Sequence, residues 1–259
     1  MSVDSSRVIL ITGATGGIGE ATAILFAKQG NYKLALHYNS AGQEARDKLL
    51  QTINEAGTTS SEVDFFQADL SDYDGVRKLH NDVTARFGGV DVLFNNAGST
   101  SGMTGVQNLA DVSIDVFEQN WRMNTGSTIL LTQLCLPHME GKGWGRIVFN
   151  SSVAAFTGGF VGPHYASSKS AMHGFIYWLG QNVAKNGITV NAVAPALIAD
   201  TAMMGSPSGE QAKRVAESKW VPVGRLGQPA EIAETVLWMV KTGYVTRKII
   251  GVDGGVHPA

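Results

Sequence analysis

The chain has 259 residues, of which 44% are hydrophobic and 16% charged, and its formal net charge is −2. This composition is typical of a folded globular protein and excludes a disordered or fibrous chain. The near-neutral charge, the lack of a basic stripe and the lack of a long apolar window or signal-peptide pattern argue against nucleic acid and membrane partners. We therefore expect one cytoplasmic domain over residues 1–259.

Short β-branched runs alternate with longer amphipathic stretches along the whole chain. The runs predict seven strands, over residues 8–12, 33–37, 62–67, 90–95, 146–150, 189–194 and 248–252. The stretches between them predict helices over residues 17–30, 43–56, 73–87, 116–140, 165–186 and 230–242. This alternation favours an α/β fold with a doubly wound, seven-stranded parallel sheet and helices on both faces.

A glycine-rich loop, TGATGGIG, follows the first strand at residues 12–19 and opens into a helix. Glycines there permit a tight turn and a close approach of the backbone to a pyrophosphate, and the helix amino terminus favours negative charge. The loop therefore predicts a dinucleotide site, although glycines also close purely structural turns. The cofactor-binding residues expected here are Gly13, Thr15, Gly16, Gly17, Ile18 and Gly19.

The spacing of this loop, TGxxxGxG, resembles that of the short-chain dehydrogenase/reductase family. The NNAG segment at residues 95–98 and Asp69-Leu70 after the third strand resemble the same family. The resemblance extends over the full chain and looks nearest to 3-oxoacyl-acyl-carrier-protein reductase-like members. It implies a single-domain Rossmann fold, and further cofactor contacts from Asp69, Leu70, Asn96, Ala97 and Gly98.

The end of the second strand bears on the choice of nicotinamide cofactor. An acidic residue there would bind the adenosine ribose hydroxyls and repel a 2′-phosphate, but the strand ends in LHYNS at residues 36–40. We therefore expect NADP(H) to be preferred over NAD(H), with Asn39 beside the phosphate. NAD(H) remains the alternative, because no basic residue follows Asn39 until Arg46.

Tyr165 and Lys169 are four residues apart at the start of a predicted helix and therefore share one face. A ketone that receives a hydride needs a proton donor, and a nearby ammonium would favour the phenolate form of a tyrosine. We expect Tyr165 to be that donor and Lys169 to tune it. An exposed helix carries such a pair by chance often enough that other residues must support this interpretation.

The family resemblance supplies that support. It implies that Ser152, thirteen residues before Tyr165, is catalytic and that Ser151 is structural. It also implies that Asn124 completes a proton relay, that Lys169 binds the nicotinamide ribose, and that Tyr165, Pro195 and Ile198 contact the cofactor.

Two departures from regular sequence patterns accompany these residues. Asn and Gly within residues 122–126 disfavour a helix interior, so we expect a kink that frees a carbonyl for water, or else an ordinary helix defect. Ala196 stands where the family usually has glycine, a change that the main-chain contact of Ile198 would tolerate.

Residues 197–223 break the alternation of strands and helices and follow the carboxyl end of a strand, where ligands bind in open α/β sheets. We expect a substrate lid there, with a plain surface insertion as the alternative. Cys135, the only cysteine, lies in an apolar helical run and is expected to be a buried inert thiol. His164 is expected to be packed or solvated, and no metal site is predicted.

The expected function is hydride transfer between NADP(H) and a small-molecule carbonyl or alcohol, of ketone or 3-oxoacyl type. The competing hypotheses are an NAD-dependent alcohol dehydrogenase and a nucleotide-sensing protein without chemistry, whose signature would be a broken set of catalytic residues. The apolar run at residues 175–179 also predicts a homo-oligomer, a dimer or tetramer.

Overall fold

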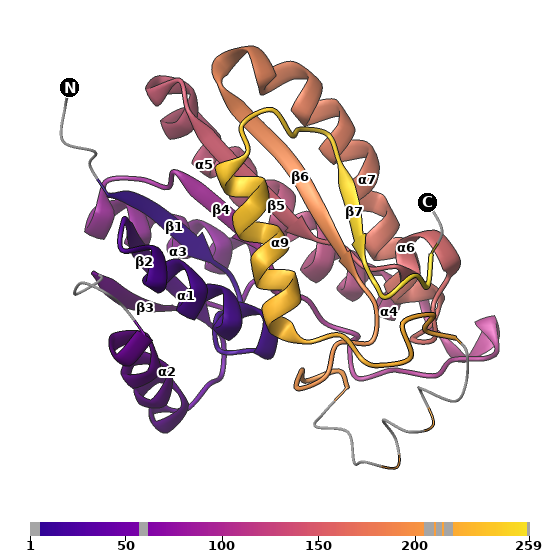
Figure 1. The fold of residues 1–259 in the computed structure, drawn as a ribbon. Helices are drawn as coiled ribbons and strands as arrows, with labels where there is room; N and C mark the ends of the chain where they lie inside the picture. Colours follow the sequence, from indigo (N-terminus) through magenta and orange to yellow (C-terminus); the bar gives the residue numbers. More distant parts are fainter. Residues whose placement is uncertain (1–5, 57–61, 205–209, 211–213, 215–219, 258–259) are drawn as a thin grey trace.

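Seven parallel strands form one sheet at the centre of the molecule (Figure 1). The computed structural model describes residues 6–56, 62–204, 210, 214 and 220–257. The strand order is β3-β2-β1-β4-β5-β6-β7, which is the doubly wound arrangement predicted from the sequence. The strands are β1 (Arg7–Ile11), β2 (Tyr32–Tyr38), β3 (Val63–Gln67), β4 (Val92–Asn95), β5 (Gly145–Asn150), β6 (Ile188–Pro195) and β7 (Ile249–Val252).

Helices cover both faces of this sheet, as predicted. One face carries α1 (Gly17–Gln29), α2 (Gln43–Ala56) and α9 (Pro229–Lys241), and α1 packs directly against α9 (Figure 1). The other face carries α3 (Tyr73–Phe87), α5 (Ser127–Lys142) and α7 (Pro163–Val183), with α4 (Ile114–Trp121) packed against α7.

The alternation of side chains along β1 shows how the sheet builds two cores. Ile9 and Ile11 are buried on the face covered by α1 and α9, whereas Leu10 is buried on the face covered by α3, α5 and α7. Because successive side chains point to opposite faces, a strand covered on both sides must be apolar throughout. This is why the strands were recognisable as short, nearly continuous apolar runs.

The predicted helix over residues 116–140 is divided in the structure. A π-helical turn, η2 (Arg122–Gly126), separates α4 from α5, at the position where the sequence predicted a kink. A Cβ at Gly126 would lie 2.2 Å from the Tyr73 hydroxyl and 2.9 Å from Trp121 Cζ3, so the glycine lets these two rings pack closely against the turn. The helix is thus interrupted where a kink was expected, and the interruption consists of one wide π-helical turn.

The predicted helix over residues 165–186 ends in the 3-10 turn η3 (Ala184–Asn186), into which α7 runs. Two short elements near the carboxyl ends of the strands were missed, η1 (Leu109–Asp111) and α6 (Ala154–Thr157). Each is too short to show a helical period. Of the residues expected to form a lid, 205–209, 211–213 and 215–219 lie outside the described part of the chain. No helix within that part is long and apolar enough to span a membrane.

Candidate active site

Hydrogen bonds tie together the carboxyl ends of the three central strands β1, β4 and β5. Thr12 Oγ1 accepts from the backbone N–H groups of Asn96 and Ala97, each at 2.9 Å. Asn96 Nδ2 donates to the Thr12 carbonyl at 2.8 Å, and Asn150 Nδ2 donates to Asn96 Oδ1 at 2.9 Å. The side chain of Asn96 therefore links the ends of β1, β4 and β5.

The glycine loop is closely packed on its inner side. A Cβ at Gly19 would lie 2.2 Å from the Gly13 carbonyl oxygen, and one at Gly17 would lie 2.1 Å from the Asp200 carbonyl oxygen. Helix α1 begins at Gly17, and no described side chain caps it. Its first N–H groups, which lack partners within the helix, are therefore available to an anionic ligand.

A groove of about 800 Å³ runs along this loop and the ends of β2 and β4. Its volume lies in the range of nucleotide and cofactor sites. Eleven of the residues predicted to bind cofactor line it: Gly13, Thr15, Gly16, Gly17, Ile18, Asn39, Asp69, Leu70, Asn96, Ala97 and Gly98. Gly19 is absent from this lining because it packs against Gly13. The glycine cradle, the uncapped helix and the groove together fit a dinucleotide.

A second cavity, of about 340 Å³, adjoins the groove. The two share Ile18, Asn150, Thr201 and Met203 as lining residues. Ser152, Tyr165, Pro195 and Ile198 line the second cavity, and Phe160 and Trp220 face each other across a ring-centroid distance of 4.3 Å in its wall. A molecule in this cavity would therefore lie beside whatever fills the groove.

Tyr165 is buried, with 6% of its surface exposed, and both it and Ser152 line the second cavity, where the Ser152 hydroxyl stabilises the phenolate form. Burial raises the pKa of Tyr165 to about 12, and the Ser152 hydroxyl offsets part of that rise. A phenol held this way keeps its proton at neutral pH and can donate it to an oxygen in the cavity.

No hydrogen bond joins Lys169 to the Tyr165 hydroxyl in the described part of the chain, and the expected tuning of Tyr165 by Lys169 stays a prediction. Lys169 Nζ lies 5.7 Å from the centre of the tyrosine ring and donates instead to the Asn150 carbonyl at 2.7 Å. Burial lowers the pKa of Lys169 to about 8, because the charged form loses its hydration. Tyr165 and Lys169 lie on one face of α7, as predicted. Both are also buried, and helix spacing alone does not show that burial.

Asn124 is fully buried and links the segment after β4 to α7 through hydrogen bonds. Its Oδ1 accepts from the Ser99 N–H at 2.8 Å, and its Nδ2 donates to the Ser99 carbonyl and to Ser168 Oγ, both at 2.9 Å. A Cβ at Gly98 would lie 3.1 Å from Asn124 Oδ1 and 3.2 Å from Lys169 Nζ. The π-helical turn, the segment after β4 and α7 thus meet at Gly98.

Three further polar residues hold this region, and sequence reasoning gave none of them a role. They are Thr12, Asn150 and His37, whose Nδ1 accepts from the Gly13 N–H at 3.0 Å. The available signal was a polar side chain at the end of a buried strand. In the sequence, Asn150 and His37 were assigned only to the ends of predicted strands and were given no role in the site.

The remaining candidates are structural in character. Ser151 Oγ is hydrogen-bonded to His173 Nε2 at 2.8 Å, and His164 is fully buried with its Nε2 3.2 Å from the Thr100 carbonyl. Cys135 is fully buried and its pKa is raised to about 12, which agrees with an inert thiol. The positive φ near the β6 end falls at Leu197 (44°) and not at Ala196, so alanine is unstrained there.

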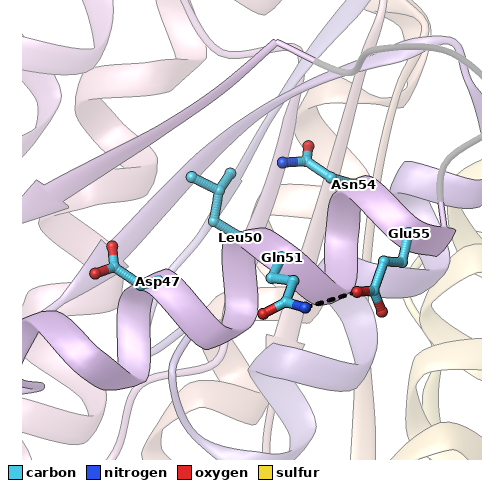
Figure 2. Close-up of a pocket in the computed structure, with 5 residues that line it drawn as sticks. All are labelled: Asp47, Leu50, Gln51, Asn54 and Glu55. Atoms are coloured by element: carbon cyan, nitrogen blue, oxygen red, sulfur yellow. Dashed lines mark hydrogen bonds between the residues drawn. The ribbon is translucent and has the colours of Figure 1, made fainter.

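Another hollow lies on the outer side of α2 and is formed by residues of that helix alone (Figure 2). Its lining consists of Asp47, Leu50, Gln51, Asn54 and Glu55, with Gln51 bonded to Glu55 at 2.8 Å. None of the predicted site residues contributes to it. The paired cavities at the strand ends are therefore the candidate active site.

Comparison with known proteins assigns this architecture to a family. Residues 7–212 match the model of the short chain dehydrogenase family. The chain is 33% identical to the 3-oxoacyl-[acyl-carrier-protein] reductase FabG of Thermotoga maritima, covering 96% of this chain and 97% of that protein. It is also 33% identical to the L-rhamnose 1-dehydrogenase (NADP(+)) of Thermoplasma acidophilum, covering 95% and 94%.

Among solved structures, the chain resembles the NADH-dependent reductase A1-R′ responsible for alginate metabolism. The TM-score is 0.85, with 29% sequence identity and 99% of each chain covered. The protein belongs to the short-chain dehydrogenase family of oxidoreductases.

Proposed function

We propose that this protein is a carbonyl reductase that uses NADP(H), with Tyr165 as the general acid and base. The placement of Tyr165 and Ser152 together in the lining of the cavity that adjoins the cofactor groove carries this proposal, because Tyr165 keeps its proton there at neutral pH. The full set of Asn124, Ser152, Tyr165 and Lys169 argues against a nucleotide-sensing protein without chemistry.

The residues that line the groove fit a nicotinamide dinucleotide. The loop from Gly13 to Gly17 and the amino end of α1 would hold the pyrophosphate, with Asp69 and Leu70 at the adenine and Pro195 and Ile198 at the carboxamide. When bound in reduced form, the nicotinamide supplies a hydride. Tyr165 and Lys169 would lie against its ribose.

The protein's own part in the reaction is proton transfer. Tyr165 Oη donates its proton to the carbonyl oxygen, while Ser152 Oγ holds that oxygen by a hydrogen bond. The product is an alcohol, and Tyr165 is left as a phenolate that must be reprotonated. Lys169 and the widened turn at Asn124 would form the relay that returns the proton.

The preference for NADP(H) is supported by the end of β2. The groove is lined there by His37, Asn39, Ser40 and Ala41, none of which carries a carboxylate that would repel a 2′-phosphate. NAD(H) is the second candidate, because no lysine or arginine belongs to the described lining of the groove. The relatives' own names differ in the same way, one with NADP(+) and one with NADH.

The second cavity favours ketone or 3-oxoacyl substrates over polyhydroxylated ones. Its described lining is mainly apolar and includes Phe160, Met203, Met204 and Trp220. An apolar lining leaves the hydroxyl groups of a sugar without partners, which costs binding energy. The described part of the segment 197–223, which supplies several of these residues, is consistent with a substrate lid.

The proposal is tested by following NADPH and NADH oxidation with a panel of ketones, 3-oxoacyl thioesters and aldoses. We expect turnover of at least one ketone or thioester, faster with NADPH. In Asn39→Asp the preference should move to NADH, because the new carboxylate repels the 2′-phosphate. Faster turnover of the wild type with NADH would overturn the cofactor assignment, and turnover of aldoses alone would overturn the substrate class.

A further inference from the structure

His37 lies at the junction between the second strand and the cofactor groove. It is the penultimate residue of β2, only 2% of its surface is exposed, and it is among the residues that line the groove. No catalytic or cofactor role for it follows from the sequence patterns discussed above. Its hydrogen-bond partners, however, include the glycine loop.

The ring and backbone of His37 hold Gly13 and Ala14 of the glycine loop and the segment after β3. The Gly13 N–H donates to Nδ1 at 3.0 Å, and Nε2 lies 3.0 Å from the Ala68 carbonyl oxygen. The His37 carbonyl accepts from the Ala14 N–H at 2.8 Å. One residue thus connects β2, the glycine loop and the end of β3.

These partners fix the tautomer of the ring. A backbone N–H can only donate, so Nδ1 must be the bare nitrogen, and a carbonyl can only accept, so Nε2 must carry the hydrogen. The neutral ring satisfies both bonds. A protonated ring would carry a hydrogen on Nδ1 that faces the Gly13 N–H, and that hydrogen bond would be lost.

The environment favours the neutral ring. Burial lowers the pKa of His37 below its ordinary value of 6.5, while the bond to Ala68 and the negative charge of Asp69 act in the opposite direction. The glycine loop adds no ionisable side chain, and Tyr38 points to the other face of the sheet, against Phe65 and Arg46. The Asp69 carboxylate is itself bonded to Ser71.

We propose that His37 is a positioning residue of the cofactor site, which holds the glycine loop through its neutral tautomer and releases it when the ring is protonated in mild acid. This inference rests on the proposed binding of a nicotinamide dinucleotide by the loop. Gly13 has a φ of 63° and the freedom of a glycine, so its hydrogen bond to His37 helps to fix the conformation that the pyrophosphate meets.

Three substitutions of His37 separate its hydrogen bond with Gly13 from its hydrogen bond with Ala68. In His37→Asn the side-chain oxygen can take the place of Nδ1 and accept from Gly13, but it does not titrate. In His37→Gln the longer amide can reach Ala68 instead, and His37→Leu keeps neither bond. His80→Asn, on α3, removes a half-buried histidine that lies outside the groove and serves as the control.

The measurement is the dissociation constant of NADPH and of NADH by fluorescence titration between about pH 5 and pH 8. For the wild type and His80→Asn we expect affinity to fall by about tenfold towards the acid end, the effect of one lost hydrogen bond. His37→Asn should bind within about threefold of the wild type at neutral pH and lose the acid dependence. His37→Gln and His37→Leu should bind about tenfold more weakly at neutral pH.

Two results would overturn the inference. One is an acid loss in His37→Asn equal to that of the wild type. The other is tighter binding of the wild type in acid, which would mean that a protonated His37 attracts the cofactor phosphates. If the wild type bound neither cofactor at any pH, the proposed function itself would fail. Thermal unfolding of each variant identifies any that does not fold. The inference is then decided by comparing the pH dependence of cofactor affinity in His37→Asn with that in the wild type.

Discussion

At the scale of single residues, the decisive feature is that Tyr165 and Lys169 are both desolvated. Burial raises the pKa of the phenol and lowers the pKa of the ammonium, so both groups are driven towards their neutral forms. In the proposed reaction, Tyr165 is thereby prepared as a donor in the direction of carbonyl reduction. In the direction of alcohol oxidation it must first lose its proton.

This asymmetry predicts different pH profiles for the two directions. Because the pKa of Tyr165 is raised to about 12, the protonated form predominates throughout the neutral range, and kcat/KM for ketone reduction should be flat there. Oxidation needs the phenolate, so its kcat/KM should rise by up to about tenfold per pH unit across that range. Initial rates in both directions check this. An oxidation rate already independent of pH at neutrality would mean that the phenolate is present and that Lys169 does tune Tyr165.

Gly98 provides a second test at this scale. A methyl group in Gly98→Ala would press on Asn124 Oδ1 and Lys169 Nζ, displacing both by a few tenths of an ångström. We expect turnover to fall by at least about tenfold, since such shifts disturb catalytic geometry, while the fold is retained. Gly42→Ala, where a Cβ would meet open space, is the control. Equal turnover in both variants would show that the contact at Gly98 does not matter to the reaction.

At the scale of secondary structure, the strands and long helices were predictable because the sheet is covered on both faces. A continuous apolar run such as residues 8–11 is typical of a strand whose two faces are both buried under helices. The groove-lining glycines and Asp69 were predictable from spacing and resemblance. His37 and Asn150 were not given roles, because their hydrogen bonds depend on which strand ends are neighbours. The local sequence does not determine the order of the strands in the sheet. The π-helical turn was predicted only as a kink, because residue propensities indicate where a helix is weak but not which hydrogen-bond pattern replaces the regular one.

Two glycines in the helices should therefore respond oppositely to alanine. Gly174 lies within α7 with open space around its Cα, so Gly174→Ala should raise the free energy of unfolding by about 0.5–1 kcal/mol. At Gly126 the new Cβ would collide with the Tyr73 hydroxyl, and Gly126→Ala should destabilise the protein by about 1–3 kcal/mol. Denaturant unfolding measures both. A stabilising Gly126→Ala would contradict the account of the π-helical turn.

At the scale of the whole molecule, α7 connects the active site to an exposed apolar surface. Tyr165 and Lys169 point inward from this helix, whereas Trp178 is 65% exposed and Tyr177 is 42% exposed. On the adjacent α4, Ile114 is 70% exposed. Exposed aromatic and aliphatic side chains of this kind are often found at interfaces between subunits.

We therefore expect a homo-oligomer, a dimer or tetramer, whose interface includes α7. Trp178→Glu should lower the molar mass measured by light scattering, because it buries a charge in that interface. Leu50→Glu, which places a charge in the hollow on α2, should leave the molar mass unchanged. A monodisperse wild-type monomer would refute the prediction.

The central claim is that Tyr165 donates the proton in the cavity beside the cofactor groove. The most direct test compares turnover and cofactor affinity in Tyr165→Phe with those in Tyr177→Phe, which removes a hydroxyl from the exposed side of the same helix. We predict that Tyr165→Phe lowers kcat by a factor of about 10² to 10⁴ while the cofactor dissociation constant stays within about threefold, and that Tyr177→Phe changes neither. A Tyr165→Phe enzyme that binds the cofactor and retains wild-type turnover would contradict the account.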